Sequence, residues 1–290
     1  VKLIPRINNI DFKTTSKYKD LLQIIANEDR KIIAGGTDVL IEARKTNKKL
    51  KLLNILAIPE LSGIKEKDDF IEIGATTTFE EIINNDLLKS YCPILVDACR
   101  QIGSKQIRNR ATLGGNIVNA APCADSVPSL IAYNANLLVK SLNNKRLIDI
   151  EDIINKNYRT QISQNEIVER IIIPKKYKNW YYSYFQLGRR KAVNITRISI
   201  SLMMQLEENL INEVRLVAGS LFYKPKRIPE IEDLLSKKKL NRELINLVEK
   251  PLVRVIENAI GKRWSAPYKI PVFVNMTQDA LLEIYEKVGK

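Results

Sequence analysis

The chain has 290 residues, of which 45% are hydrophobic and 28% charged, as in a folded protein with a substantial core. It contains no histidine, which excludes histidine-based catalytic triads, histidine-ligated metals and histidine general bases. Its three cysteines form no CxxC pair, so no disulfide framework, zinc site or iron–sulfur cluster is indicated. Any catalysis by this chain would therefore depend on a bound cofactor.

The formal net charge of +14 has two explanations. Basic faces bind nucleic acid, but here the basic residues form short clusters without a nucleic-acid-binding motif, so we expect no nucleic-acid partner. An acidic partner or an anionic cofactor explains the charge equally well. The first residues lack a signal peptide, and no run of about 18 apolar residues occurs, so we expect a cytoplasmic chain without a membrane span.

Residues 1–56 are predicted to form a small α/β domain. Apolar spacing indicates a helix, a strand, a helix and a strand, in that order, over 17–27, 31–34, 39–45 and 51–56. The sequence "AGGTD" lies between the first strand and the second helix, where Thr37 and Asp38 can cap that helix. A turn is therefore predicted at Gly35 and Gly36.

Residues 57–175 are predicted to form a second, α+β domain. Strands are indicated over 70–75 and 166–174, with a hairpin over 136–150 that turns at Asn143 and Asn144. Helices are indicated over 76–85, 91–109 and 126–135. The stretch "ATLGGNIVNAAPCAD", residues 111–125, is expected to interrupt this helical region, because it combines a glycine pair with a run of small side chains.

Residues 176–290 are predicted to form a third domain, with the boundary near 174–178. Three successive β-like runs indicate an antiparallel sheet, over 180–190, 197–208 and 210–221. Three helical segments follow, over 228–238, 241–260 and 271–288. No internal repeat or low-complexity tract occurs in the chain.

The two glycine pairs are the strongest functional signals. Neither matches GxGxxG or a phosphate-binding P-loop, so these nucleotide folds are excluded. The pair in "AGGTD" alone is typical of an ordinary turn, and Asp125 and Ser126 alone could cap a helix. Two glycine pairs with an aspartate behind the second instead predict that a phosphate-bearing dinucleotide lies along two backbone loops.

With both loops in this order, the sequence resembles the FAD-binding medium subunits of the molybdenum hydroxylases, the group of xanthine dehydrogenase and carbon monoxide dehydrogenase. The resemblance spans nearly the whole chain through "AGGTDVLIE", "IPELSGI", "IEIGATTTFEEI", "QIRNRATLGGNIVNAAPCADSVPSL", "EIVERIIIP" and "YFQLGRRKAVNI". Xanthine dehydrogenases whose FAD subunit is a separate chain are the most similar, partly through "RWSAPYK". The implied fold class is α+β, a vanillyl-alcohol-oxidase-type FAD-binding fold of two α/β subdomains, followed by an antiparallel sheet with helices.

The resemblance implies non-covalent FAD, with the loop Ile32–Val39 around its pyrophosphate and Thr112–Asn116 as the second loop. It implies that Asp125 hydrogen-bonds the cofactor and that Ile195 lies near the isoalloxazine ring. No catalytic residue and no metal ligand is expected in this chain. The residues expected to contact FAD are Ile32, Ile33, Ala34, Gly35, Gly36, Thr37, Asp38, Val39, Ile102, Thr112, Leu113, Gly114, Gly115, Asn116, Ala120, Asp125, Val168, Gln186 and Ile195.

Two positions depart from the family pattern. Many relatives have a flavin-contacting lysine where this chain has Gln186, and an acidic residue where it has Asn194. A cation near the flavin favours the negatively charged reduced form, so Gln186 is expected to make the flavin harder to reduce unless Arg189 and Arg190 compensate. Cys123, within the second loop region, is expected to act as a small filler.

The function that the resemblance implies is electron transfer. A large subunit with the molybdenum cofactor hydroxylates the substrate, and a small subunit with two 2Fe–2S clusters passes electrons to FAD in this chain. An acceptor such as NAD+ then takes them, and the complex is expected to be a dimer of heterotrimers. Xanthine or another purine is the expected substrate, with nicotinate, an aldehyde or carbon monoxide as alternatives. The few cysteines argue against the benzoyl-CoA-reducing branch, which carries an extra iron–sulfur cluster.

Two other classes of function remain as alternatives at this point. A stand-alone flavoenzyme of the same fold would need a positioned acid or base and a substrate domain, and the C-terminal region offers no clear candidate. A basic binding module would need no flavin at all.

Overall fold

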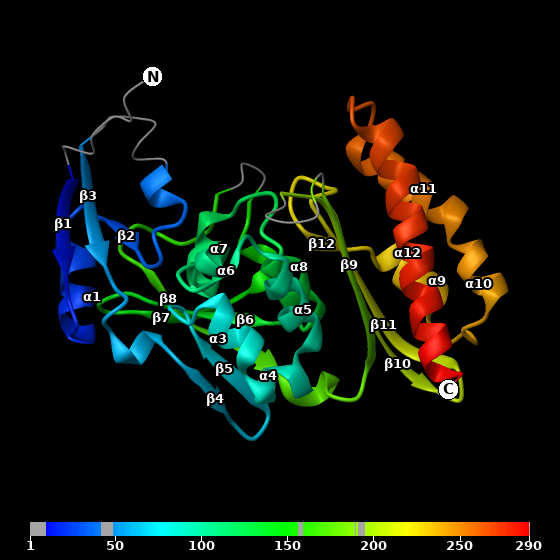
Figure 1. Ribbon diagram of the computed structural model, residues 1–290, viewed down its shortest axis with the longest axis horizontal. Coiled ribbons are helices and arrows are strands. Elements are labelled where there is room, and N and C mark those ends of the chain that lie inside the picture. The colour runs from blue at the N-terminus through cyan, green and yellow to red at the C-terminus, as the bar shows by residue number, and fades with distance from the viewer. Residues whose placement is uncertain (1–9, 42–48, 156–158, 189, 191–194, 290) are drawn as a thin grey trace.

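The computed structural model describes residues 10–41, 49–155, 159–188, 190 and 195–289. Figure 1 shows three units in chain order along the longest axis, each built around its own sheet. Within the described residues, no helix is long and apolar enough to cross a membrane.

The first unit is a three-stranded parallel sheet with one helix. Its strands, in sheet order, are β1 (Ile10–Thr14), β3 (Leu50–Asn54) and β2 (Lys31–Ile33). The helix α1 (Tyr18–Asn27) forms because apolar residues recur at helical spacing, and it buries Leu21, Leu22 and Ile25. A helical turn starts at 39–41, and the rest of the helix predicted over 39–45 lies outside the described residues.

The middle unit is a five-stranded sheet with helices packed against it. The strands, in sheet order, are β4 (Ile64–Glu66), β5 (Phe70–Gly74), β8 (Ile167–Pro174), β6 (Asn136–Lys140) and β7 (Lys145–Asp149). The helices are α3 (Phe79–Asn84), α4 (Asp86–Tyr91), α5 (Pro93–Gln101), α6 (Lys105–Arg108), α7 (Leu113–Asn119) and α8 (Ser126–Ala132). Their apolar faces and the sheet enclose the main core, which includes Phe79, Tyr133 and Ile171.

The third unit is a four-stranded antiparallel sheet covered by helices. Its strands, in sheet order, are β12 (Lys226–Arg227), β11 (Leu210–Gly219), β10 (Thr196–Glu207) and β9 (Tyr181–Gly188). Its helices are α9 (Pro229–Leu235), α10 (Arg242–Leu247), α11 (Glu249–Ile260) and α12 (Ala266–Val288). Figure 1 shows the sheet between these helices and α5 and α8 of the middle unit.

Strand β10 shows why the sheet of the third unit is buried on both of its faces. Its residues alternate between the two faces of the sheet, with Ile198, Ile200 and Leu202 in the core beneath the C-terminal helices. Met203 faces the other way and belongs to the core of the middle unit. The sheet is therefore buried on both faces and joins two cores.

The predicted mixed fold with a C-terminal antiparallel sheet is confirmed, with local differences. Residues 113–119 form helix α7, although an interruption was expected there. The helix expected over 241–260 is split into α10 and α11, and Pro251, which lacks a backbone N–H, lies in the first turn of α11, where that group is not needed. Helix α12 begins at Ala266, before the expected start, and contains Pro271.

Candidate functional site

A cavity of about 470 Å³ lies beside the end of strand β2, between the first and middle units. Three segments line it: residues 30–39, residues 111–119 around the start of α7, and residues 162–168 leading into β8. The apolar side chains of Ile55 and Val168 form part of its wall. Both glycine pairs, which are far apart in the sequence, therefore face one space.

The loop after β2 offers unused backbone donors to this cavity. Among the described residues, no acceptor takes the backbone N–H groups of Gly35, Gly36 or Thr37. Gly36 has a φ of +74°, a left-handed conformation that glycine adopts at little cost. Consecutive N–H groups in such a loop form an anion-binding concavity. The loop can therefore hold a phosphate without a charged side chain.

Two contacts fix this loop against the segment around α7. A Cβ on Gly35 would lie 1.9 Å from the carbonyl oxygen of Arg110, so only glycine allows the two backbones to approach this closely. At the other end of α7, Asn119 Nδ2 donates a hydrogen bond to Asp38 Oδ2 at 3.1 Å. The first and middle units thus hold the cavity between them by direct contact.

The second glycine pair lies in the first turn of helix α7. Helix α7 begins after Thr112, whose Oγ1 accepts a hydrogen bond from the Gly115 N–H at 3.1 Å. The N–H of Gly114 donates to the carbonyl oxygen of Ala75 at 2.9 Å. The N–H groups of Gly114 and Gly115 are therefore used within the protein, and the expected contact of residues 112–116 with FAD stays a prediction. Gly114 is needed for packing, because a Cβ there would lie 2.6 Å from the Cβ of Ala75.

Helix α7 offers a side-chain donor to the cavity through Asn116. Its Oδ1 accepts a hydrogen bond from Ser126 Oγ at 2.7 Å, which sets the orientation of the amide. The amide nitrogen has no hydrogen-bond partner among the described residues. Asn116 lines the cavity, so this N–H₂ group is available to an acceptor there.

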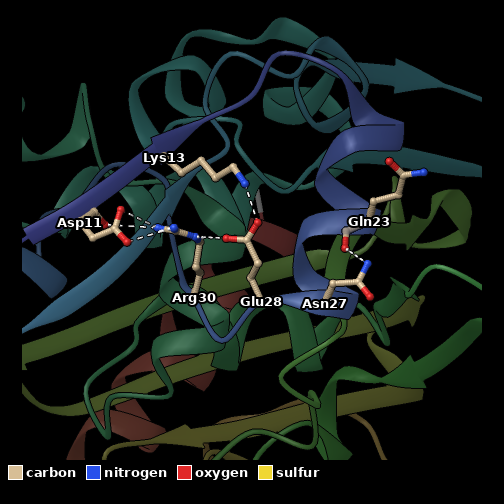
Figure 2. Close-up of polar contacts among 6 residues, drawn as sticks. All are labelled: Asp11, Lys13, Gln23, Asn27, Glu28 and Arg30. Atoms are coloured by element: carbon tan, nitrogen blue, oxygen red, sulfur yellow. Dashed lines mark hydrogen bonds and ion pairs between the residues drawn. The ribbon is translucent and has the colours of Figure 1, made fainter.

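Arg30, which lines the cavity, is committed to partners within the protein. Figure 2 shows its guanidinium between two carboxylates: both terminal nitrogens donate to Asp11 at 3.0 Å, and Nε donates to Glu28 at 2.5 Å. Glu28 also accepts from Lys13, and the hydrogen bonds from Arg30 and Lys13 lower the pKa of Glu28 to about 2. Because two carboxylates bind its guanidinium, Arg30 is not available to a ligand. Through Asp11 it connects β1 to the segment that enters β2.

A second polar cluster lies between the middle unit and the third unit. Gln186 Nε2 and Thr196 Oγ1 both donate to Asp125 Oδ2, at 2.8 and 2.7 Å, and Gln186 also donates to Thr196. The other carboxylate oxygen, Oδ1, is buried and has no partner within the described residues. Burial raises the pKa of Asp125 to about 7, although both hydrogen bonds act in the opposite direction. A buried oxygen without a partner is costly, so this corner suits a ligand that hydrogen-bonds Oδ1.

Cys123 links the cluster at Asp125 to the cavity. Burial, Asp125 and Asp38 all raise the pKa of its thiol, so the thiol lies within the fields of both carboxylates. Ser126, next to Asp125 in the chain, donates to Asn116, which lines the cavity, so a hydrogen bond connects the two sites.

The expected FAD-contacting residues fall into groups. Those that line the cavity are Ile32, Ala34, Gly35, Gly36, Thr37, Asp38, Val39, Thr112, Gly114, Gly115, Asn116 and Val168. Asp125 and Gln186 form the second cluster, and Ile195 next to it is 65% exposed. Outside the cavity lining are Ile33, Leu113 and Ala120, which are buried, and Ile102, which packs partly buried on the main core. Asn194 and Arg189 lie outside the described residues.

Several residues of the site were not predicted from the sequence, among them Asn119, Gln164 and Thr196. Thr196 hydrogen-bonds Asp125, Asn119 bonds Asp38, and Gln164 lines the cavity from the segment before β8. Asn119 lies within the small-residue stretch 111–125, and Thr196 follows Ile195, an expected FAD contact. Proximity in the sequence to expected site residues was therefore a weak signal that both belong to the site. Gln164 lies in a polar loop with no distinguishing pattern.

These features fit the dinucleotide that the resemblance implies. Three backbone N–H groups without an acceptor in the described part of the chain suit a pyrophosphate. The cavity wall combines apolar side chains with the amide of Asn116, whose nitrogen has no partner there either. Asp125 Oδ1, to which no described residue donates, supplies an acceptor for a hydroxyl or ring N–H of the same ligand.

Comparison with known proteins gives consistent matches over almost the whole chain. Residues 8–176 match the family of FAD-binding domains in molybdopterin dehydrogenases, and residues 183–284 match the CO dehydrogenase flavoprotein C-terminal domain. The chain is 29% identical over 260 residues to the glyceraldehyde dehydrogenase medium chain of Sulfolobus acidocaldarius, covering 89% of this chain and 92% of that one. It is 28% identical over 274 residues to the xanthine dehydrogenase FAD-binding subunit of Escherichia coli O157:H7, covering 93% and 94%.

The fold also matches a solved structure. A chain of carbon monoxide dehydrogenase from Hydrogenophaga pseudoflava superimposes with a TM-score of 0.88 at 23% identity, covering 98% of this chain and 99% of that one. The first family match alone covers more than half of the chain, and it includes both glycine pairs and Asp125. The chain therefore belongs to the family of FAD-binding domains in molybdopterin dehydrogenases.

Proposed function

We propose that the pyrophosphate of FAD binds at the backbone N–H groups of Gly35, Gly36 and Thr37. This assignment rests above all on three consecutive donors at the end of β2 that no described residue accepts from, and that face a cavity large enough for part of a dinucleotide. The Asn116 amide nitrogen then donates to the same ligand from α7. Apolar contact comes from Ile32, Val39 and Val168.

The flavin end of the cofactor is assigned to the corner of Asp125, Gln186 and Ile195. Asp125 Oδ1 is buried and has no hydrogen-bond partner among the described residues, and Gln186 donates to the other oxygen of the same carboxylate. Ile195, 65% exposed, offers an apolar surface at this corner. The remaining expected contacts, Ile33, Ile102, Leu113 and Ala120, support the cavity walls from behind in this proposal.

FAD, when bound, supplies reversible uptake and release of electrons, and the chain needs no acid–base residue of its own for that task. The residues of this chain bind and orient the cofactor: backbone donors hold the phosphates, and the positioned carboxyl of Asp125 orients the polar part of the flavin end. The buried surroundings of Asp125 limit the access of water to that end.

The chain is proposed to act as the electron-transfer subunit of a larger complex. Several relatives of similar length are named as medium chains or FAD-binding subunits of dehydrogenases. The proposed partners are a large subunit with the molybdenum cofactor and a small subunit with 2Fe–2S clusters, arranged as a dimer of heterotrimers in the cytoplasm. The proposed acceptor is NAD+, and the proposed substrate of the complex is xanthine or another purine, as named for one relative.

The division into domains 1–56, 57–175 and 176–290 is part of this proposal. It is supported by the three separate sheets, which end or begin near these boundaries. In this arrangement the first two domains enclose the cavity, and the third completes the corner of Asp125 through Gln186 and Thr196.

The cofactor assignment is tested by expressing the chain and analysing its flavin. We expect a yellow protein that releases intact FAD, without FMN, when it is denatured. A colourless protein that does not take up FAD on reconstitution would contradict the assignment.

The assignment of partners and substrate is tested on the native complex. Affinity purification of the chain from its own cells is expected to recover a molybdenum-containing and an iron–sulfur subunit. The purified complex is then assayed for hydroxylation of xanthine, nicotinate, aldehydes and carbon monoxide. Turnover of xanthine supports the purine assignment, and turnover of another of these substrates alone excludes it. An active yellow protein without partners would identify a stand-alone flavoenzyme.

A further inference from the structure

Four buried side-chain oxygens without a hydrogen-bond partner among the described residues lie where the middle unit meets the third unit. They are Asp125 Oδ1, the hydroxyl oxygen of Tyr184, Ser199 Oγ and Ser201 Oγ. Asp125 and both serines are at most 6% exposed. A buried polar atom without a partner costs free energy and is rare in native proteins, so four of them in one region need a physical reason.

The pairing of strands β9 and β10 places the three hydroxyl-bearing residues beside one another. Ser201 pairs with Tyr184 and Ser199 pairs with Gln186, so these four side chains leave the same face of the sheet. Side chains paired across two strands have Cβ atoms about 5 Å apart. Gln186 donates to Asp125 Oδ2 at 2.8 Å, which brings the carboxyl group to one end of the row. We call Tyr184, Ser199 and Ser201 the hydroxyl row.

The hydroxyl row faces helices α5 and α8 of the middle unit. Helix α5 contacts β9, and helix α8 contacts β10 and β11. Tyr184 packs against the core of the middle unit, to which Met203 on the same face also belongs. A Cβ on Gly219, which pairs with Ser199, would lie 2.1 Å from Ser199 Oγ and 2.7 Å from Cγ of Pro128 in α8. The row is therefore enclosed between the sheet and these helices.

Close packing explains why the serines of the row are small, but not why they are polar. The opposite face of β10 carries large apolar side chains such as Ile198 and Ile200. Alanine would fit beside the helices as well as Ser199 or Ser201 does, and phenylalanine would replace the ring of Tyr184, without burying a hydroxyl. A buried water molecule makes about three hydrogen bonds to buried polar groups, so it is a suitable partner for closely spaced hydroxyls.

We propose that the hydroxyl row binds water molecules that connect it to Asp125 Oδ1, and that this buried water supplies protons to the flavin end of FAD. The water site depends only on the oxygens of the row and of Asp125, whereas the proton supply rests on the proposed function. Conversion of FAD to FADH₂ takes up two electrons and two protons, and the buried surroundings of Asp125 limit direct contact with solvent.

The hydroxyl groups have the chemistry that such a supply needs. Each hydroxyl both donates and accepts, so it can accept a proton on one side and give one up on the other. Burial raises the pKa of Tyr184 well above its ordinary value, and the Asp125 carboxylate raises it further, so this hydroxyl keeps its proton at neutral pH.

A high-resolution crystal structure of the FAD-loaded chain tests the water site directly. We expect at least one ordered water molecule within hydrogen-bond distance of two or more of the four oxygens. Electron density without water between these oxygens, or hydroxyls that bond only to protein acceptors, overturns the proposal.

The sign of a stability change gives a second test of the water site, and it needs no FAD. Tyr184→Phe and Ser201→Ala each remove one hydroxyl to which no described residue is hydrogen-bonded. If water binds there, urea unfolding is expected to show a folded-to-unfolded ratio lowered by roughly fivefold, the equivalent of one hydrogen bond. If the row is dry, loss of an unpartnered oxygen leaves this ratio unchanged or raises it, and the proposal is wrong. Tyr268→Phe is the control, because Tyr268 is 47% exposed and no change is expected there.

The proton supply is tested with the FAD-loaded chain and reduced methyl viologen, a one-electron donor that carries no proton. Two viologen molecules supply the electrons for one FAD, and the protons come from the solvent, where a pH indicator records their uptake in a stopped-flow experiment. In Tyr184→Phe the rate of proton uptake is expected to fall by roughly tenfold or more, because positioned proton transfer contributes at least this much. The dissociation constant of FAD is expected to stay unchanged, and Tyr268→Phe is expected to behave like the parent chain.

The outcomes separate the water site, the proton supply and the proposed function. Ordered water together with unchanged proton uptake in Tyr184→Phe overturns the proton supply alone. A dry hydroxyl row overturns the whole proposal and leaves the FAD assignment standing. A chain that never binds FAD overturns the proposed function and the proton supply with it, while the stability test still decides the water site.

Discussion

The backbone of Gly35 lies against the backbone of Arg110, so closely that a Cβ on Gly35 would be 1.9 Å from the Arg110 carbonyl oxygen. The two residues belong to different units of the fold, and the contact brings the first glycine loop to the start of helix α7. The cavity between the units exists in its present form because position 35 has no side chain.

Gly35→Ala is accordingly expected to weaken FAD retention strongly. The added methyl group meets a backbone carbonyl that no rotamer change can move, so the loop must shift, at a cost of roughly 1–3 kcal/mol. Flavin content after purification and the dissociation constant of FAD measure the effect. Gly289→Ala is the control, because a Cβ there meets nothing closer than 3.7 Å. Full flavin occupancy in Gly35→Ala would show that the loop is not part of the site.

Gln186→Lys is expected to raise the midpoint potential of the bound FAD. A cation at this position favours the negatively charged reduced flavin, and we expect a shift of about 30 mV, the equivalent of a tenfold change in a two-electron equilibrium. Spectroelectrochemical titration measures it, with Gln186→Met as the uncharged control. Gln186 already donates to Asp125, so the new ammonium also meets that carboxylate. No upward shift in the lysine variant would end the idea that Gln186 sets the potential.

Asp125 is expected to make the FAD-free chain less stable as pH rises. Burial raises its pKa from 3.8 in the unfolded chain to about 7 in the folded protein. Between these values the folded state holds a proton that the unfolded state has lost, so the free energy of unfolding falls as pH rises from about 4 to about 7. The decrease is at most about 4 kcal/mol, and it levels off above the folded pKa.

Denaturant unfolding of the chain and of Asp125→Asn at pH 5 and pH 8 tests this dependence. The asparagine variant cannot ionise, so its stability relative to the parent chain is expected to be higher at pH 8 than at pH 5. A constant difference between the two proteins across this range would mean that Asp125 is ionised throughout.

Arg215→Met is expected to destabilise the chain by about 2–4 kcal/mol. Arg215 on β11 is buried, and its Nε and Nη2 donate to the carbonyl oxygens of Ala132 and Ile131, at 2.5 and 3.0 Å. The substitution removes the side-chain donors from these helix-end carbonyls of α8; the Ile131 oxygen still accepts from the Asn134 N–H, whereas the Ala132 oxygen has no other donor among the described residues. Urea unfolding measures the loss, and Arg242→Met, on an exposed site, is expected to change stability by less than about 0.5 kcal/mol. Equal stability of the two variants would contradict this account.

Much of the secondary structure was predictable from the local pattern of apolar and polar residues. Residues 18–27 repeat apolar side chains at helical spacing, and residues 70–74 alternate them, so α1 and β5 were predicted close to their observed bounds. Thr78 and Glu81 form the capping box that begins α3, within the segment predicted as a capped helix. The short strands β1 and β4 were not predicted, because a few residues carry too little periodicity and depend on partners elsewhere in the chain.

The candidate site was also predictable only in part, because some of its features are local sequence patterns and others depend on partners elsewhere in the chain. The glycine pairs and Asp125 are visible in the sequence, and so is the resemblance that connects them. Helix α7 was missed because glycine disfavours helices, whereas here the Thr112 cap and the fit of Gly114 against Ala75 outweigh that preference.

The sequence by itself determined which residues could serve a dinucleotide, because a missing Cβ and a carboxylate are properties of single residues. The tertiary structure decided how each is used. Among the described residues the N–H groups at Gly35 and Gly36 remain free, while that of Gly114 donates to the carbonyl oxygen of Ala75, 39 residues earlier in the chain. Asp125 finds Gln186 and Thr196 only across 61 and 71 residues of chain. Hydrogen bonds and close packing between distant segments depend on the fold, and no local pattern specifies them.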